Sequence, residues 1–107
     1  MAYSKNQIGK KIRTFVESLK GEIIVDGAIL FGSYAWGHPK PYSDIDVAII
    51  SRNFRDKDEM KDTQYLFKKA AAIDSTIEPL PFHPKDLKKP DPRSLLFQIM
   101  KKGRKIL

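Results

Sequence analysis

The chain has 107 residues, with 20 Lys and Arg against 13 Asp and Glu and no cysteine. This length suits one domain over 1–107, and the lack of cysteine excludes disulfides and thiolate-bound metal ions. No segment approaches the roughly 20 apolar residues of a membrane span, and no signal-peptide core is visible near the start. We expect a soluble, cytoplasmic protein without a membrane partner. Its net charge of +7 suits either a lysine-rich surface or attraction to nucleic acid, nucleotides or acidic proteins.

The N-terminal part is predicted to form a helix, a strand and a loop. Ser4 to Lys20 has apolar residues at helical spacing, and Ser4 and Gln7 have the spacing of a capping box. A strand is expected from Ala28 to Phe31. Gly32 to Ser43 is rich in Gly, Pro, Ser and Tyr, which is typical of a loop.

The middle of the chain is predicted to contain an interior strand and a long helix. In the strand, Asp44 to Ser51, apolar residues stand at consecutive positions, which indicates burial on both faces and helices on the sheet. In the helix, Asp58 to Ile73, the apolar stripe includes Met60 and Phe67.

A short third strand is expected from Ser75 to Glu78. Pro79 and Pro81 should end it, because proline cannot donate to a strand ladder. A last helix should begin at Asp91-Pro92, which combines a cap residue with proline at the first helical position.

That last helix is expected to turn Leu95 inward and to end at Gly103, and Ile106-Leu107 could add an edge strand. The predicted order is therefore helix, strand, loop, strand, helix, strand, helix. This alternation favours an α/β or α+β fold in which helices cover a small sheet.

The most informative stretch joins the first two strands. Gly32 and Ser33 are followed, after ten residues, by Asp44 and Asp46. Gly32 lets the backbone turn sharply, and Ser33 offers a hydroxyl and an N–H where an anion can bind. Asp44 and Asp46 are two apart on a strand, so both carboxylates point to one face. Two such carboxylates need a cation, and Mg²⁺ is usually held by carboxylates with substrate phosphates. Taken separately, Gly-Ser is often only a turn and Asp-x-Asp often an exposed strand entry.

Together these residues resemble the signature of the DNA polymerase β-like nucleotidyltransferases. They are most similar to the minimal nucleotidyltransferases, the MNT proteins that are encoded beside HEPN proteins in prokaryotes. Tyr42 to Val47 resembles the strand entry of that family, Ile77 to Phe82 its third-strand motif, and Ile99 to Leu107 its last helix and edge strand. The resemblance implies one nucleotidyltransferase domain with the palm-like fold of polymerase β, a small mixed sheet flanked by helices.

The resemblance also assigns roles to five residues. It implies that Gly32 and Ser33 bind the nucleotide. It implies a catalytic, metal-binding set that consists of Asp44, Asp46 and Glu78.

The third acid of this set has a rival nearby. Glu78 stands between Ile77 and Pro79 at a strand end, an odd place for an acid without a partner. Asp74 lies four residues earlier, where the end of a helix or a turn is the more typical role.

One departure from the family concerns Trp36, because many relatives carry a basic residue there that could contact phosphates. Lys40 or Arg52 could compensate for the missing charge. Two tyrosines of the loop, Tyr34 and Tyr42, either line the pocket or pack against the protein. His38 is expected to be an exposed loop residue and not a ligand.

By this resemblance the protein transfers an NMP, with AMP from ATP expected, to a hydroxyl, using two Mg²⁺ ions or alternatively Mn²⁺. Relatives adenylylate a tyrosine of their partner HEPN toxin, so the implied role is an antitoxin with a HEPN-type partner. The basic charge could help to dock that partner or its RNA. The alternative is a non-catalytic antitoxin that neutralises its partner by contact alone.

Overall fold

Four short strands form the centre of the fold. In this computed structural model the described residues are 3–41, 43–54 and 59–107, and their strands are β1 (Gly27–Phe31), β2 (Ile45–Ile50), β3 (Ile77–Phe82) and β4 (Arg104–Lys105). The strands lie in the order β3-β2-β1-β4. β2 is parallel to β3, whereas β1 is antiparallel to both β2 and β4. The sequence correctly predicted a small mixed sheet.

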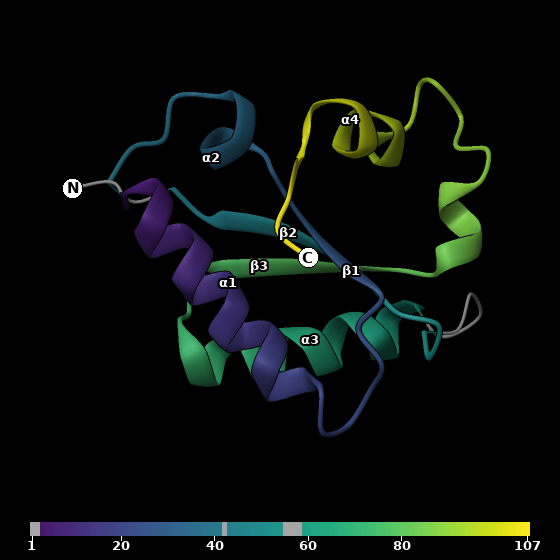
Figure 1. Cartoon of the computed structure of the whole chain (residues 1–107), viewed down its shortest axis with the longest axis horizontal. Helices are drawn as coiled ribbons and strands as arrows, with labels where there is room; N and C mark the ends of the chain where they lie inside the picture. Colours follow the sequence, from purple (N-terminus) through teal and green to yellow (C-terminus); the bar gives the residue numbers. More distant parts are fainter. Residues whose placement is uncertain (1–2, 42, 55–58) are drawn as a thin grey trace.

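Two long helices cover one face of this sheet (Figure 1). α1 (Lys5–Leu19) and α3 (Glu59–Ile73) bury apolar side chains in one cluster with residues of β1, β2 and β3. α1 begins as predicted, because the Ser4 hydroxyl accepts from the Gln7 N–H and the Gln7 side chain accepts from the Ser4 N–H. No helix within the described ranges is long and apolar enough to cross a membrane.

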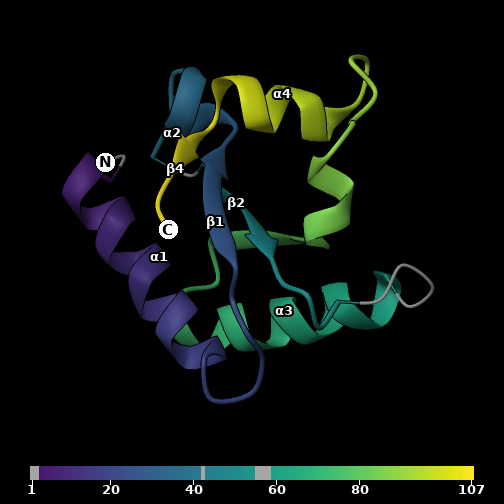
Figure 2. The ribbon, with the colours of Figure 1, turned by 45° about the vertical axis from the view of Figure 1, so that its right-hand side comes forward.

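The opposite face is covered mainly by α4 (Leu95–Lys102), whose Ile99 packs with Phe31 and Ala48. A short 3-10 helix, η2 (Pro84–Leu87), follows the far end of β3. Figure 2 shows α4 on one side of the strands and both long helices on the other. Asp46 and Glu78 lie on this same face, near one end of β2 and β3.

A single helical turn, α2 (Ser33–Trp36), follows β1 directly. The Gly32 carbonyl accepts the N–H groups of Ala35 and Trp36 and so closes the turn. The sequence predicted mostly loop here, so this element was missed.

β2 is an interior strand, as its run of apolar residues predicted. It lies between β1 and β3, and the residues along it are buried except for Asp46. Because both faces are packed, the strand holds the position of its one half-buried carboxylate firmly.

β3 is longer than the sequence indicated, and the expectation that it ends at Glu78 is wrong. The strand continues through Pro79 and Pro81 to Phe82. β3 lies at the edge of the sheet and pairs with β2 alone. The two prolines are at alternate positions, so both nitrogens face the open side, where no donor is needed. Glu78 is thus the second residue of its strand.

α4 begins later than predicted. Its cap is Ser94, whose hydroxyl accepts from the Phe97 N–H, while Asp91 forms the preceding turn and accepts from Arg93. This shift leaves Leu95 at 51% exposure instead of inside the core. The helix ends at Gly103 as expected.

Two further details differ from the predictions. Met60 and Phe67 of α3 are 74% and 42% exposed, so the buried stripe of this helix is narrower than its apolar pattern. The edge strand comes before Ile106-Leu107, whose N–H groups instead both donate to the Ala28 carbonyl and extend the pairing with β1.

Candidate active site

The acidic residues of the motif gather at one end of the sheet, on the face that α4 partly covers. Asp46 of β2 and Glu78 of β3 are direct partners in the parallel register. Paired positions of neighbouring strands present their side chains to the same face. Asp44 lies immediately before β2, two residues from Asp46, and its side chain is exposed. The structure therefore brings together the three acids that the sequence singled out.

These carboxylates disfavour one another's charge. Burial raises the pKa of Asp46, and the charge of Asp44 raises it further, although a hydrogen bond with Glu78 acts in the opposite direction. Burial also raises the pKa of Glu78, followed by the charges of Asp44 and Asp46. Like charges held this close favour a bound cation, which would let all three groups ionise.

Gly32 brings the backbone against the Asp46 carboxylate. Its φ of 75° lies in the left-handed region, and among the described residues no other residue has a positive φ. A Cβ at Gly32 would overlap Asp46 Oδ2 and would lie 3.1 Å from Asp46 Cγ. Only glycine fits here, for reasons of both conformation and space.

Ser33 is the first residue of α2 and lies directly after this contact. The N–H groups in the first turn of a helix have no partners within the helix. The start of α2 therefore places N–H donors and a hydroxyl next to the acidic cluster. A phosphate group held near Asp46 by a cation would meet these donors.

The donor set fits a hard divalent cation, because it consists of carboxylate oxygens. Among the described residues, however, no three acidic, histidine or cysteine side chains form a ready-made metal cage. A site of this kind would have to be completed by ligands from the substrate or by water, as is usual for Mg²⁺ with phosphates.

Asp74, the rival acid, has other partners. It forms an ion pair with Lys11, and its Oδ1 accepts from both the N–H and the hydroxyl of Thr76. Burial opposes its ionisation, but the hydrogen bonds from Lys11 and Thr76 lower the pKa of Asp74 to about 2. Asp74 therefore fixes the turn that leads into β3.

The two basic residues suggested as substitutes for a charge at position 36 differ in their placement. Arg52 follows the far end of β2 and forms a two-pronged ion pair with Asp26, so it does not compensate. Lys40 lies in the exposed loop before Asp44, where its N–H donates to the Ser43 hydroxyl.

The aromatic residues of the motif are divided between surface and core. Trp36 is 43% exposed and tilts against Phe31, with 6.3 Å between ring centroids. Tyr34 stacks on Tyr3 and packs against the main core. His38 is exposed, and Tyr42 lies outside the described residues.

Sequence reasoning missed a network of contacts around Lys11 and Tyr3. Lys11 lies over the Tyr3 ring at 4.6 Å and binds Asp74, and the Tyr3 N–H donates to the Tyr34 hydroxyl. These contacts link α1, α2 and the start of β3. A lysine on the polar side of an amphipathic helix carries no signal that could have revealed this role.

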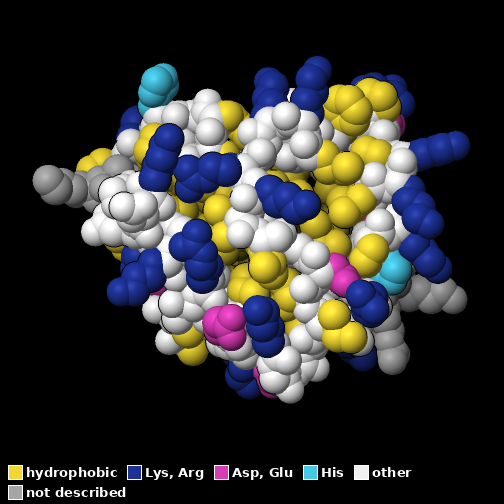
Figure 3. Space-filling view, viewed as in Figure 1, with side chains coloured by type: hydrophobic (Ala, Val, Ile, Leu, Met, Phe, Trp, Pro, Cys, Tyr) yellow, Lys and Arg dark blue, Asp and Glu magenta, His cyan; other side chains and the backbone are white. Residues whose placement is uncertain are grey.

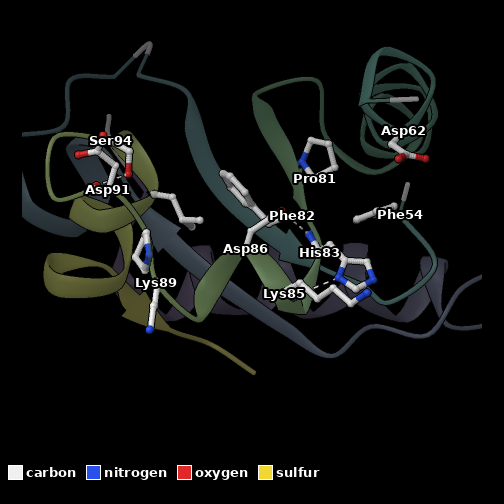
Figure 4. A pocket seen from close by; sticks show the side chains of 12 residues that line it. Phe54, Asp62, Pro81, Phe82, His83, Lys85, Asp86, Lys89, Asp91 and Ser94 are labelled. Atoms are coloured by element: carbon white, nitrogen blue, oxygen red, sulfur yellow. Dashed lines mark hydrogen bonds between the residues drawn. The ribbon is translucent and has the colours of Figure 1, made fainter. Parts of the chain in front are cut away.

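A cavity of about 560 Å³ lies away from the carboxylates, at the other end of β3. Figure 4 shows it between Phe54, Phe82 and His83 on one side and Asp91 and Ser94 on the other. None of the acids of the motif lines it, so this hollow is not the candidate active site.

Comparison with known protein families assigns the chain to a family. A family model described as "Nucleotidyltransferase domain" matches residues 10–106, nearly the whole chain. No curated protein is similar enough to the chain to be matched.

Solved structures share the fold at low sequence identity. A protein from Sulfolobus solfataricus that is assigned as a nucleotidyltransferase has a TM-score of 0.67 and 16% identity, over 98% of this chain and 89% of its own. A chain of a toxin–antitoxin crystallised with AMP-PNP has a TM-score of 0.56 and 24% identity, over 92% and 72%. A chain from the complex of tri-AMPylated Shewanella oneidensis HEPN toxin with MNT antitoxin has a TM-score of 0.53 and 19% identity, over 94% and 71%.

Proposed function

The chain belongs to the nucleotidyltransferase domain family, and from this premise we propose that it transfers AMP from ATP to a hydroxyl group of a HEPN-type partner protein. Membership in the family supports nucleotidyl transfer in general. Complexes of similar fold that contain AMP-PNP, or an AMPylated HEPN toxin with its MNT antitoxin, support the choice of nucleotide and partner. In this proposal residues 1–107 act as one catalytic domain in the cytoplasm.

The observation that supports the proposal most is the pairing of Asp46 with Glu78 beside Gly32. It combines a cluster of carboxylates with a tight backbone turn at the start of a helix. Such a combination can hold a divalent cation and a phosphate at adjacent positions.

In the proposed reaction the acceptor oxygen forms a bond to the α-phosphorus, the bond to the bridging oxygen breaks, and pyrophosphate leaves. Asp44, Asp46 and Glu78 would hold two Mg²⁺ ions, or Mn²⁺ in their place. Such ions, when bound, neutralise phosphate charge and favour ionisation of the hydroxyl. Gly32 lets the backbone turn close against Asp46, and Ser33, directly after it, donates to the oxygens of the triphosphate.

The proposal can be tested by following ³²P from α-labelled ATP onto the HEPN-type protein encoded nearest to this chain. Wild-type protein with Mg²⁺ should label the partner, whereas Asp44→Asn and Asp46→Asn should not, because each removes a cation ligand. Circular dichroism should show that both variants keep their fold, since each change also removes a repelling charge.

If both variants labelled the partner at the wild-type rate, the assignment of the carboxylates would be wrong. If the wild-type protein bound the partner without transferring label and still prevented its activity, the contact-only antitoxin would be the better account.

A further inference from the structure

A second feature of the α4 side of the sheet is a groove at the end opposite the carboxylates. Its volume is about 340 Å³. Its apolar floor and walls come from β1, β2, η2, α4 and the last residue of the chain: Ile29, Ile50, Pro84, Leu87, Met100 and Leu107. Met100 and Leu107 are 42% and 45% exposed, which is high for residues of their size and polarity. Figure 3 shows apolar side chains gathered in this hollow below α4.

The groove is lined largely by the most basic part of the chain, and Lys105 itself lines it. Residues 83–107 contain eight Lys and Arg but only two Asp, so they hold +6 of the net charge of +7. Both aspartates have partners, since Asp91 is paired with Arg93 and Asp86 accepts from the His83 N–H. Asp26, which lines the groove, is neutralised by Arg52. Figure 3 shows Lys and Arg side chains around the hollow.

The lining of the groove indicates which kind of polyanion fits. Binding of single-stranded nucleic acid relies on exposed aromatic rings on which bases stack. The residues that line this groove are aliphatic, apart from Asp26, Gly27, Gly103 and Lys105. An aliphatic groove with a basic rim is complementary to an amphipathic helix that has apolar residues on one side and acidic residues on the other.

We propose that this groove is the docking site for an acidic amphipathic helix of the partner protein that carries the acceptor hydroxyl. The inference rests on the proposed transfer to a protein acceptor. Lys105 lies on β4 opposite Ile29 in the register and lines the groove, so it is placed to pair with an acidic side chain of the helix. Met100 on α4 would pack against the apolar side.

The position of the groove suits this role. β1 runs from Gly27, at the groove, to Phe31, which is paired with Asp46 at the active site. Gly27 and Phe31 are four strand steps apart, which corresponds to about 13 Å. A helix in the groove would therefore leave the carboxylates open to a hydroxyl on a neighbouring segment of the partner.

The probe is a fluorescently labelled, designed helical peptide with Leu on one side and Glu on the other, and binding is measured by anisotropy. A twin peptide with Lys in place of Glu and an oligouridylate RNA serve as comparisons. The Leu/Glu peptide should bind the full chain. Met100→Glu and Lys105→Glu should each weaken it at least about tenfold, or 1.4 kcal/mol. Lys68→Glu makes the same charge change as Lys105→Glu at an exposed position of α3, and it should change the affinity for the peptide less than twofold.

Three results would overturn the docking proposal. The first is that the Lys twin peptide binds as tightly as the Leu/Glu peptide, and the second is that Lys68→Glu and Lys105→Glu lose affinity for the peptide equally. The third is that the peptide fails to bind while the RNA binds and is weakened by Met100→Glu and Lys105→Glu.

MgATP titrations separate this proposal from the proposed enzyme function. Groove variants should bind MgATP like the wild type, and Asp46→Asn should bind the peptide like the wild type. If the wild-type chain bound the peptide but did not bind MgATP, the groove proposal would stand and the proposed active site would be refuted.

Discussion

At Gly32 the backbone approaches the Asp46 carboxylate so closely that no side chain fits between them. This contact is a structural reason for glycine at this position of the motif. The sequence indicated the sharp turn, but it could not show that the turn ends against Asp46, because that depends on the antiparallel pairing of β1 with β2.

Gly32→Ala should therefore disrupt the site. A residue with a Cβ costs on the order of 1–3 kcal/mol in this backbone conformation, with φ of 75° and ψ of −155°, and the new methyl would also displace Asp46. We expect MgATP affinity, measured by calorimetry, to fall at least about tenfold. Gly21→Ala is the matched control, because nothing lies within 4 Å of a Cβ there. Normal affinity in Gly32→Ala would contradict the proposed contact with the phosphate site.

From the sequence, two acids compete for the third place in the set, because Glu78 and Asp74 are only four residues apart. Glu78→Gln should bind MgATP nearly normally but transfer AMP at least about a hundredfold more slowly, a loss of roughly 2.7 kcal/mol in transition-state stabilisation. Asp74→Asn should change the rate only a fewfold, because Asp74 is occupied by Lys11 and Thr76. Single-turnover kinetics measure both. If Asp74→Asn were slow and Glu78→Gln normal, Asp74 would be the third ligand.

At the scale of elements, the ion pair between Lys11 and Asp74 joins α1 to the turn before β3. The pKa of Asp74 is about 2 in the folded chain, below the ordinary value of 3.8. The ionised Asp74, held by Lys11 and by Thr76, therefore contributes stability above about pH 4, and this contribution is lost as the pH falls through 2.

Lys11→Met should remove the part of this contribution that comes from Lys11, while the hydrogen bonds from Thr76 stay. We expect the free energy of unfolding at pH 7 to fall by roughly 1 kcal/mol, and the difference from the wild type to disappear near pH 2. Urea denaturation across this pH range measures it. Lys10→Met, an exposed neighbour on the same helix, is the control. A difference that did not depend on pH would mean that Lys11 acts through packing and not through the charge of Asp74.

The elements show what could be predicted from sequence and what could not. The two long helices follow from apolar residues at helical spacing, and at α1 also from a complete capping box at Ser4, whereas β2 follows from an unbroken run of apolar residues. The predicted third strand was too short, because the rule that proline ends a strand does not hold at a sheet edge. The start of α4 was misplaced because Asp91 and Ser94 are both good caps, and only tertiary packing chooses between them.

At the scale of the whole molecule, one side of the sheet holds both candidate sites. The carboxylates lie at one end and the basic groove at the other. Local spacing predicted the first, because Asp44 and Asp46 are close in sequence. The groove could not be predicted, because its lining residues come from four separate stretches of the sequence between Asp26 and Leu107.

The central claim is that the paired carboxylates bind a nucleotide through a divalent cation. Calorimetric titration of ATP into the wild-type chain, with and without Mg²⁺, tests it most directly. Without the cation the carboxylates repel the triphosphate, so affinity should be weak, and Mg²⁺ should strengthen it at least about a hundredfold, or 2.7 kcal/mol. Asp46→Asn should lose most of this gain. Equal affinity with and without Mg²⁺, or an unchanged gain in Asp46→Asn, would contradict the account.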